Sequence, residues 1–276
     1  MELIENLILD EERALYGLKH TAVKNCIFKG PADGESALKE CRDIYVSNCT
    51  FDLRYPFWHV KKAEIAESEM SINCRAPLWY SESLSVIRTK IPGVKALREC
   101  RNIKINFSDF ESAEFGWFSK NISIHNSSVK GEYPFFQCKK LNAENLNLTG
   151  KYSFQYSRDV DIKKSVLDTK DAFWHAKNVT VYDSFIKGEY LGWYSENLRL
   201  VRCRIEGTQP LCYAKNLILE DCEMIDCDLA FERSSVNAKI IGNIDSVKNP
   251  LSGSIEASSI GETIMDGTVK SSCIIK

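Results

Sequence analysis

Apolar and polar positions recur along this chain with a period of 19 residues over most of its length. One small residue per repeat serves as a reference position. These residues are Leu18, Cys41, Val60, Ser81, Cys100, Ser119, Cys138, Ser157, Ala176, Ser195 and Ala214. Their spacings are 23, 19 and 21 residues, followed by seven spacings of 19. So constant a period indicates one structural unit that is used again and again.

Positions within a repeat can be counted from its reference residue. Positions +3 and +5 are apolar in nearly every repeat and alternate with polar residues, as at Ile103 and Ile105. This period of two predicts a strand. Further apolar residues recur at +10 and −3, and Ser, Thr or Cys recurs at +8. No segment keeps a helical period, so each repeat is expected to hold three short strands with inward apolar side chains.

The turn residues fit a solenoid. Asn or Asp often stands at +2, where it tolerates the left-handed conformation of a tight corner, and Gly-Pro or X-Pro pairs mark another corner. The sequence therefore predicts an all-β fold, a single-stranded right-handed parallel β-helix (solenoid) of about 12 coils. We expect one domain over residues 1–276, with an N-terminal cap at 1–13, regular coils at 14–232, and degenerate coils with a C-terminal cap at 233–276.

Composition narrows the function classes. The formal net charge is −2 and no basic cluster occurs, which argues against a nucleic-acid partner. The apolar runs are too short for a membrane-spanning helix, and the first residues lack the features of a secretory signal, so we expect a cytoplasmic protein without a membrane partner. Most of the eleven cysteines occupy the reference or +8 position, where they are expected to pack as small inward residues. We therefore expect no metal site and no cofactor.

All five tryptophans fall at position −2, and Tyr, His and Phe are frequent at −1. We call positions −2 and −1 the aromatic stripe. Its candidate ligand-binding residues are Trp58, Trp79, Tyr80, Trp117, Trp174, His175 and Trp193. Because −3 is apolar and Lys39 and Arg98 interrupt the −2 column, the tryptophans are expected to point outward. Three interpretations stay open for the stripe: a groove for an oligosaccharide, a homodimer interface, or stacking that only stabilises the fold.

A second candidate site lies on the first coils. The longest corner insertion carries Asp33 and Glu35, and Arg54 and Arg75 occupy corners of the next two coils. Beside them, Glu40, His59, Tyr80 and Glu99 are expected to stack on adjacent coils. Glu40, His59 and Glu99 are the candidate catalytic residues, since carboxylates beside a His can do acid–base work on a sugar. The two glutamates are three coils apart, roughly 14 Å, which is too far for a paired glycosidase mechanism. A solvated charge network is the alternative interpretation.

Three segments carry a resemblance to a known family: residues 30–40 (GPADGESALKE), 53–59 (LRYPFWH) and 240–257 (IIGNIDSVKNPLSGSIEA). They resemble a bacterial family that is known only as a domain of unknown function with a pectin-lyase-like, right-handed β-helix fold. The resemblance covers the whole chain and implies the fold without an activity. Pectin-lyase-like proteins often act on polysaccharides, which is an analogy at the level of the fold.

The sequence thus predicts a β-helix protein that binds carbohydrate through the aromatic stripe. A homodimeric cytoplasmic scaffold and a polysaccharide-processing lyase or hydrolase stay open as alternatives, so whether the protein is an enzyme is left undecided.

Overall fold

The computed structural model describes residues 1–30 and 36–276, and in these ranges the chain forms strands and turns without a helix. No helix capable of crossing a membrane therefore occurs in the described part of the chain. The chain divides into two compact units, unit 1 (residues 1–141) and unit 2 (residues 142–276). Both are parallel β-solenoids, and the chain makes about 14 turns with a repeat of about 19 residues. The predicted fold class is confirmed, and the number of turns is slightly larger than expected.

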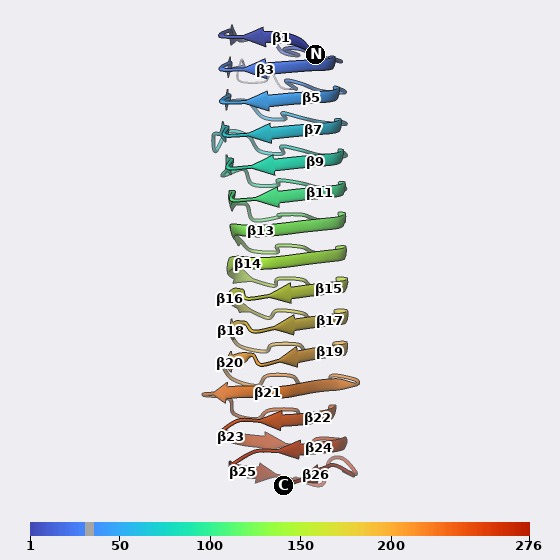
Figure 1. The fold of residues 1–276 in the computed structure, drawn as a ribbon. Helices are drawn as coiled ribbons and strands as arrows, with labels where there is room; N and C mark the ends of the chain where they lie inside the picture. Colours follow the sequence, from blue (N-terminus) through green and yellow to red (C-terminus); the bar gives the residue numbers. More distant parts are fainter. Residues whose placement is uncertain (31–35) are drawn as a thin grey trace. The chain divides into compact units, whose positions relative to one another are not determined.

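In unit 1 each coil up to β12 (Asp109–Glu111) has one long and one short strand, and in the following coil the two are joined in β13 (Lys120–Gly131). Figure 1 shows the long strands of unit 1 side by side in chain order. The long strands pair in parallel from each coil to the next: β1 (Glu2–Glu5), β3 (Lys19–Lys24), β5 (Arg42–Ser47), β7 (Lys61–Ala66), β9 (Glu82–Ile87), β11 (Arg101–Asn106) and the first part of β13 (Lys120–Gly131). The short strands form a second ladder: β2 (Ile8–Leu9), β4 (Ile27–Phe28), β6 (Thr50–Phe51), β8 (Glu69–Met70), β10 (Lys90–Ile91), β12 (Asp109–Glu111) and the end of β13.

Unit 2 repeats the arrangement after β14 (Lys139–Lys151), the strand in which the two units meet in the sequence. The ladder of long strands continues through β15 (Arg158–Lys163), β17 (Lys177–Tyr182), β19 (Glu196–Val201), β21 (Leu217–Ile225), β22 (Ser235–Ile240) and β24 (Ser252–Glu256), and it ends on the two-residue β26 (Ile274–Ile275). The short strands are β16 (Val166–Lys170), β18 (Phe185–Lys187) and β20 (Arg204–Glu206), and β23 (Asn243–Lys248) with β25 (Ser259–Ile264) forms a separate two-stranded sheet.

The prediction of a third strand in each coil is wrong. The segment before the reference residue is a turn in which positions −3 and −1 adopt left-handed conformations, as at Leu78 (φ 65°) and Tyr80 (φ 57°). Alternate left-handed residues cannot form an extended strand. A left-handed Leu or Phe costs roughly 1–2 kcal/mol, and burial of its side chain, which is complete for Phe57, contributes roughly 1.5–3 kcal/mol. Inward packing therefore overrides the backbone preference at this corner.

The core consists of the predicted inward columns. Positions +3, +5, +8 and +10 are buried in every regular coil, and aromatic residues at +10 stack directly, as Phe28 does on Phe51 at 4.7 Å between ring centroids. The side chains of the +8 column also form hydrogen bonds with the backbone. Their hydroxyls accept a hydrogen bond from a backbone N–H one coil earlier, as Ser165 Oγ does from Leu146 at 3.0 Å. Small polar residues at +8 thus satisfy backbone groups that the sheets leave unpaired.

The cysteines at the reference and +8 positions are buried small residues, as predicted. All eleven cysteines of the chain are free thiols, and ten of them are buried. Burial raises the pKa of Cys100 and Cys138 to about 12. Several thiols hydrogen-bond to backbone carbonyls, as Cys100 Sγ does to Leu78 at 2.6 Å. Cysteine therefore substitutes for serine as a small inward residue.

Both ends of the chain continue the ladders. Residues 1–13, expected as a cap, contain β1 and β2, and Ile4 pairs with Val23 in the next coil. Residues 233–276 form coils of uneven length: Ser235 pairs with Ser252, 17 positions later, and Ser254 pairs with Ile274, 20 positions later. The loosened period of the tail thus reflects a change in coil length.

Candidate functional site

Each tryptophan of the aromatic stripe is half-buried and clamps its coil to the next one. Its indole N–H donates to the backbone carbonyl at position −5 of the following coil. The pairs are Trp58–Ala76 (2.7 Å), Trp79–Lys95 (2.5 Å), Trp117–Tyr133 (2.8 Å), Trp174–Tyr190 (3.0 Å) and Trp193–Gln209 (2.8 Å). The repetition of this bond explains why tryptophan recurs at one position: its ring reaches a carbonyl at the corner of the next coil.

The ring faces in the −2 column are largely used within the protein. In unit 1, Trp58 and Trp79 stack at 5.3 Å with an interplanar angle of 3°. The guanidinium of Arg98 then lies 5.1 Å from the Trp79 ring and 5.5 Å from that of Trp117. Its Nε is buried without a hydrogen bond and lies 3.7 Å from Glu99 Oε1, an ion-pair distance. Arg98 is thus the one non-aromatic residue between Trp79 and Trp117 in the −2 column, and its guanidinium continues the stack of rings.

Position −1, whose direction the sequence left open, points to solvent. In unit 1, His59 and Tyr80 stack at 5.1 Å, and Tyr80 is 38% exposed. The rings of unit 2 form a longer stack, which comprises Tyr156, His175, Tyr194 and Tyr213 with centroid distances of 4.9, 5.0 and 4.9 Å. Burial and the nearby Glu232 carboxylate raise the pKa of Tyr213. The stripe therefore offers solvent the edges of ordered rings.

The predicted catalytic residues lie on successive coils. Each of their turns is hydrogen-bonded to the next through the backbone. The Glu40 N–H donates to the Trp58 carbonyl (2.8 Å), the His59 N–H to the Trp79 carbonyl (3.0 Å), and the Tyr80 N–H to the Arg98 carbonyl (2.9 Å). The side chains of Glu40, His59, Tyr80 and Glu99 are exposed. The two carboxylates remain three coils apart, roughly 14 Å, with His59 and Tyr80 between them. This arrangement brings no two carboxylates together on opposite sides of a bond.

Of the other residues of the second candidate site, the structure describes Arg54 and Arg75. Arg54 and Arg75 line a cavity of about 470 Å³ together with Lys29, Asp52, Ile72 and others. Asp52 accepts hydrogen bonds from Ser71 (2.5 Å) and Asn73 (2.8 Å), which lower its pKa. Asp33 and Glu35 lie outside the described residues.

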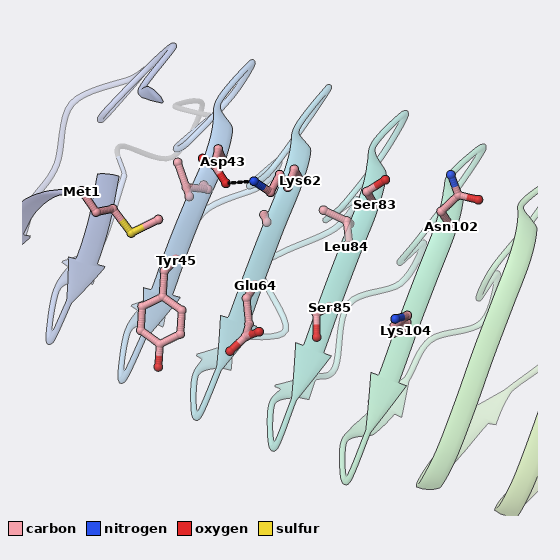
Figure 2. A pocket seen from close by; sticks show the side chains of 12 residues that line it. Met1, Asp43, Tyr45, Lys62, Glu64, Ser83, Leu84, Ser85, Asn102 and Lys104 are labelled. Carbon is pink, nitrogen blue, oxygen red and sulfur yellow. Dashed lines mark ion pairs between the residues drawn. The ribbon is translucent and has the colours of Figure 1, made fainter. Parts of the chain in front are cut away.

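A shallow trough that the sequence prediction missed lies on the outer face of the long strands of unit 1 (Figure 2). Its volume is about 480 Å³. Figure 2 shows two rows of side chains across β5, β7, β9 and β11, one at position +2 and one at +4. The first row is Asp43, Lys62, Ser83 and Asn102, and the second is Tyr45, Glu64, Ser85 and Lys104. We call these rows the walls of the unit 1 trough.

The backbone conformation of each coil determines where the two walls lie. The residue at +2 is left-handed in each coil and is omitted from the ladder: Lys61 pairs with Glu82 and Ala63 with Leu84, whereas Lys62 has no paired partner in this ladder. A left-handed residue at this point turns the strand, so its side chain and that at +4 stand on either side of the inward +3 residue.

Unit 2 carries a trough at the same repeat positions, with a volume of about 460 Å³. Its +2 wall is Asp159, Asn178, Asn197 and Asn216, and its +4 wall is Asp161, Thr180, Arg199 and Ile218. The asparagines form a ladder in which each side-chain N–H donates to the oxygen one coil earlier, at 3.0, 2.9 and 3.1 Å. The recurrent Asn at +2 is the sequence signal for this wall, although the pattern alone indicates only a corner residue.

Within residues 1–30 and 36–276, no group of three or more His, Cys, Asp or Glu side chains is arranged to hold a metal ion.

Comparison with known proteins identifies the family. The family model described as "Protein of unknown function (DUF3737)" matches residues 2–276, and the chain belongs to that family. No curated protein matches.

Several solved structures have a similar fold. PfbA, a surface adhesin of Streptococcus pneumoniae, is 10% identical with a TM-score of 0.42, and the match covers 90% of this chain and 71% of that one. The A-module of the Azotobacter vinelandii mannuronan C-5 epimerase AlgE4 is 11% identical with a TM-score of 0.30, and the match covers 86% and 79% of the two chains. The catalytic domain of a GH87 alpha-1,3-glucanase is 9% identical with a TM-score of 0.34, at 100% and 64% coverage.

Proposed function

We propose that this member of a family of unknown function binds a carbohydrate chain without cleaving it, through the aromatic stripe. The observation that supports the proposal is the exposed column at position −1. In unit 2 it presents the edges of Tyr156, His175 and Tyr194, which form one ordered stack with the half-buried Tyr213. Phenol hydroxyls and imidazole nitrogens both donate and accept hydrogen bonds, as sugar hydroxyls require.

The stacking favours binding for a thermodynamic reason. Each ring is held by its neighbours, at 5.0 Å between His175 and Tyr194, before a ligand arrives. A ligand therefore does not have to immobilise these side chains, which would otherwise cost roughly 0.5–1.5 kcal/mol each. Because the ring faces inside the stack are occupied, the contacts would be made by ring edges, hydroxyls and imidazole nitrogens.

Titration of the intrinsic tryptophan fluorescence with a mixed oligosaccharide pool tests the proposal. All five tryptophans lie in the stripe, so a bound chain should shift or quench their emission saturably. Tyr194→Gly should weaken this response, since glycine keeps the left-handed backbone (φ 57°) and removes the ring. Phe107→Gly is a matched control, because Phe107 is left-handed (φ 52°) and 58% exposed but lies outside the stripe. Emission that ignores every sugar would refute the proposal.

A homodimeric scaffold is the second candidate function. The observation that favours it is the same exposed aromatic surface, since Tyr and Trp are frequent anchors of protein interfaces. Light scattering distinguishes the two candidates. A dimer that Tyr194→Gly converts to monomers would favour the scaffold, and a monomer whose fluorescence responds to sugar would favour carbohydrate binding.

The enzyme alternative depends on Glu40, His59 and Glu99. Their exposure on separate coils gives it less support than either binding function. Polysaccharide turnover that is abolished by Glu40→Ala or His59→Ala would establish it, whereas turnover that survives both changes would exclude this cluster as the active site.

We also propose a cytoplasmic location. The support is the set of eleven free cysteines, which a reducing compartment preserves. Cell fractionation tests the location, and recovery of the protein outside the cytoplasm would contradict it.

A further inference from the structure

We infer that the troughs on the long strands form a second binding site, which takes an unbranched, neutral oligosaccharide. This site is separate from the aromatic stripe, because the trough walls occupy positions +2 and +4 and the stripe occupies −2 and −1. The inference therefore stands or falls independently of the proposed function.

The first argument is repetition. Unit 1 and unit 2 each carry a trough of similar volume, about 480 and 460 Å³, at the same two repeat positions. In both units the +2 wall is set by a left-handed residue, such as Asn102 (φ 58°) or Asn197 (φ 56°). Each trough crosses four coils, so its polar groups recur roughly every 4.8 Å. A ligand that follows such a row must itself be an extended chain with regularly spaced polar groups.

The second argument is the hydrogen-bonding capacity of the amide ladder. Asn178 donates one N–H to Asp159 and accepts one bond from Asn197. An amide has two N–H donors and two acceptor lone pairs. One donor and one acceptor per internal rung are therefore left over from the ladder. Paired donors and acceptors at each rung match hydroxyl groups, which both donate and accept.

The opposite wall adds groups of the same kind. It contributes the hydroxyl of Thr180 in unit 2 and that of Ser85 in unit 1, both half-exposed. Hydroxyls and amides face each other across the inward +3 residue. A chain of sugar hydroxyls can therefore be bound from both sides.

The third argument is charge, which selects a neutral ligand. In unit 1 the Lys62 ammonium lies 2.7 Å from Asp43, so both charges have a partner within the wall. In unit 2 the guanidinium of Arg199 forms two hydrogen bonds with Glu220, at 3.1 and 2.9 Å. Asp161 is exposed in the unit 2 trough, where its carboxylate repels a polyanion. The unit 1 walls hold one further cation, Lys104, and one further carboxylate, Glu64. Among the described residues that line them, neither trough thus gathers a cluster of cations for uronate or phosphate groups.

Isothermal titration calorimetry on the full chain tests the inference. The probes are a pool of neutral α- and β-linked glucose hexasaccharides and, as an anionic counterpart, a galacturonate hexasaccharide. The neutral pool should bind saturably, and the galacturonate should bind at least several-fold more weakly. The double variant Asn178→Gly with Asn197→Gly removes two amides while glycine keeps the left-handed backbone. It should weaken binding of the neutral pool on the order of tenfold, for two lost hydrogen bonds.

Two further variants make the outcome decisive. Asn25→Gly is the matched control, because Asn25 is an exposed, left-handed asparagine (φ 52°) in an amide pair with Asn6, away from both troughs. Tyr194→Gly reports on the stripe. Loss of affinity in the double variant, with the control unchanged, supports the inference whatever the stripe variant does. Loss in Tyr194→Gly alone overturns the inference and leaves the proposed function standing. No saturable binding of the neutral pool, or equal binding of the galacturonate, also overturns it.

Discussion

Replacing Ser165 by alanine should destabilise unit 2 although no apolar contact is lost. Ser165 lies in the +8 column with 3% of its surface exposed. Its hydroxyl accepts a hydrogen bond from the Leu146 N–H at 3.0 Å and donates one to the Lys163 carbonyl at 2.7 Å. Alanine removes both bonds and leaves the Leu146 N–H buried without this partner.

The expected loss in the free energy of unfolding follows from the Leu146 N–H, which is left without its acceptor. An unsatisfied buried donor costs roughly 1–3 kcal/mol, and the Lys163 carbonyl is only part-buried, so we expect a loss of about 2 kcal/mol in the free energy of unfolding. Ser165→Cys should cost less than half as much. Cys49 occupies the same column, and its thiol accepts a hydrogen bond from the Cys26 N–H of the preceding coil at 3.4 Å.

Urea denaturation followed by circular dichroism measures the loss, and amide hydrogen exchange at Leu146 locates it. Ser85→Ala is the control, because Ser85 is half-exposed on the outer face and should change the stability by less than about 0.5 kcal/mol. The reasoning is refuted if Ser165→Ala costs no more than this control, or if the cysteine variant is as unstable as the alanine variant.

Three further changes have expected outcomes. Trp193→Phe keeps the ring stack but removes the N–H that bonds to the Gln209 carbonyl, so urea denaturation should show a loss of about 1 kcal/mol; unchanged stability would contradict the clamp. Hydrogen bonds from Thr268 hold the pKa of Asp266 at about 2, below its ordinary value of 3.8. The stability that Asp266 contributes is therefore present above its ordinary pKa and lost as the pH falls through about 2, and Thr268→Val should raise this pKa in a carbon-detected NMR titration. Cys273 alone should react with a maleimide dye in the native protein, since the ten other cysteines are buried; labelling of several thiols under native conditions would contradict their burial.

The candidate site was only partly predictable. The Trp column and the succession Glu40, His59, Tyr80, Glu99 followed from the period alone, since residues one period apart become neighbours in a solenoid. The contacts that the aromatic rings of the stripe make could not be predicted from the period. The clamp from Trp193 to Gln209 depends on where the next corner lies in space.

The solenoid, its period and its inward columns follow from the sequence, because burial at a fixed spacing sets the order of apolar residues along the chain. The interchange of cysteine and serine as small residues of the core is also visible in the sequence. Three features become apparent only in the folded chain: positions −3 and −1 are left-handed turn residues, the ring faces of the −2 column are largely covered, and +2 and +4 enclose a trough. These features depend on backbone conformation and on contacts between neighbouring coils. A one-dimensional pattern does not specify such contacts: the recurrent Asn at +2 is visible in the sequence, but an outward polar residue appears the same whether it lines a trough or only meets water.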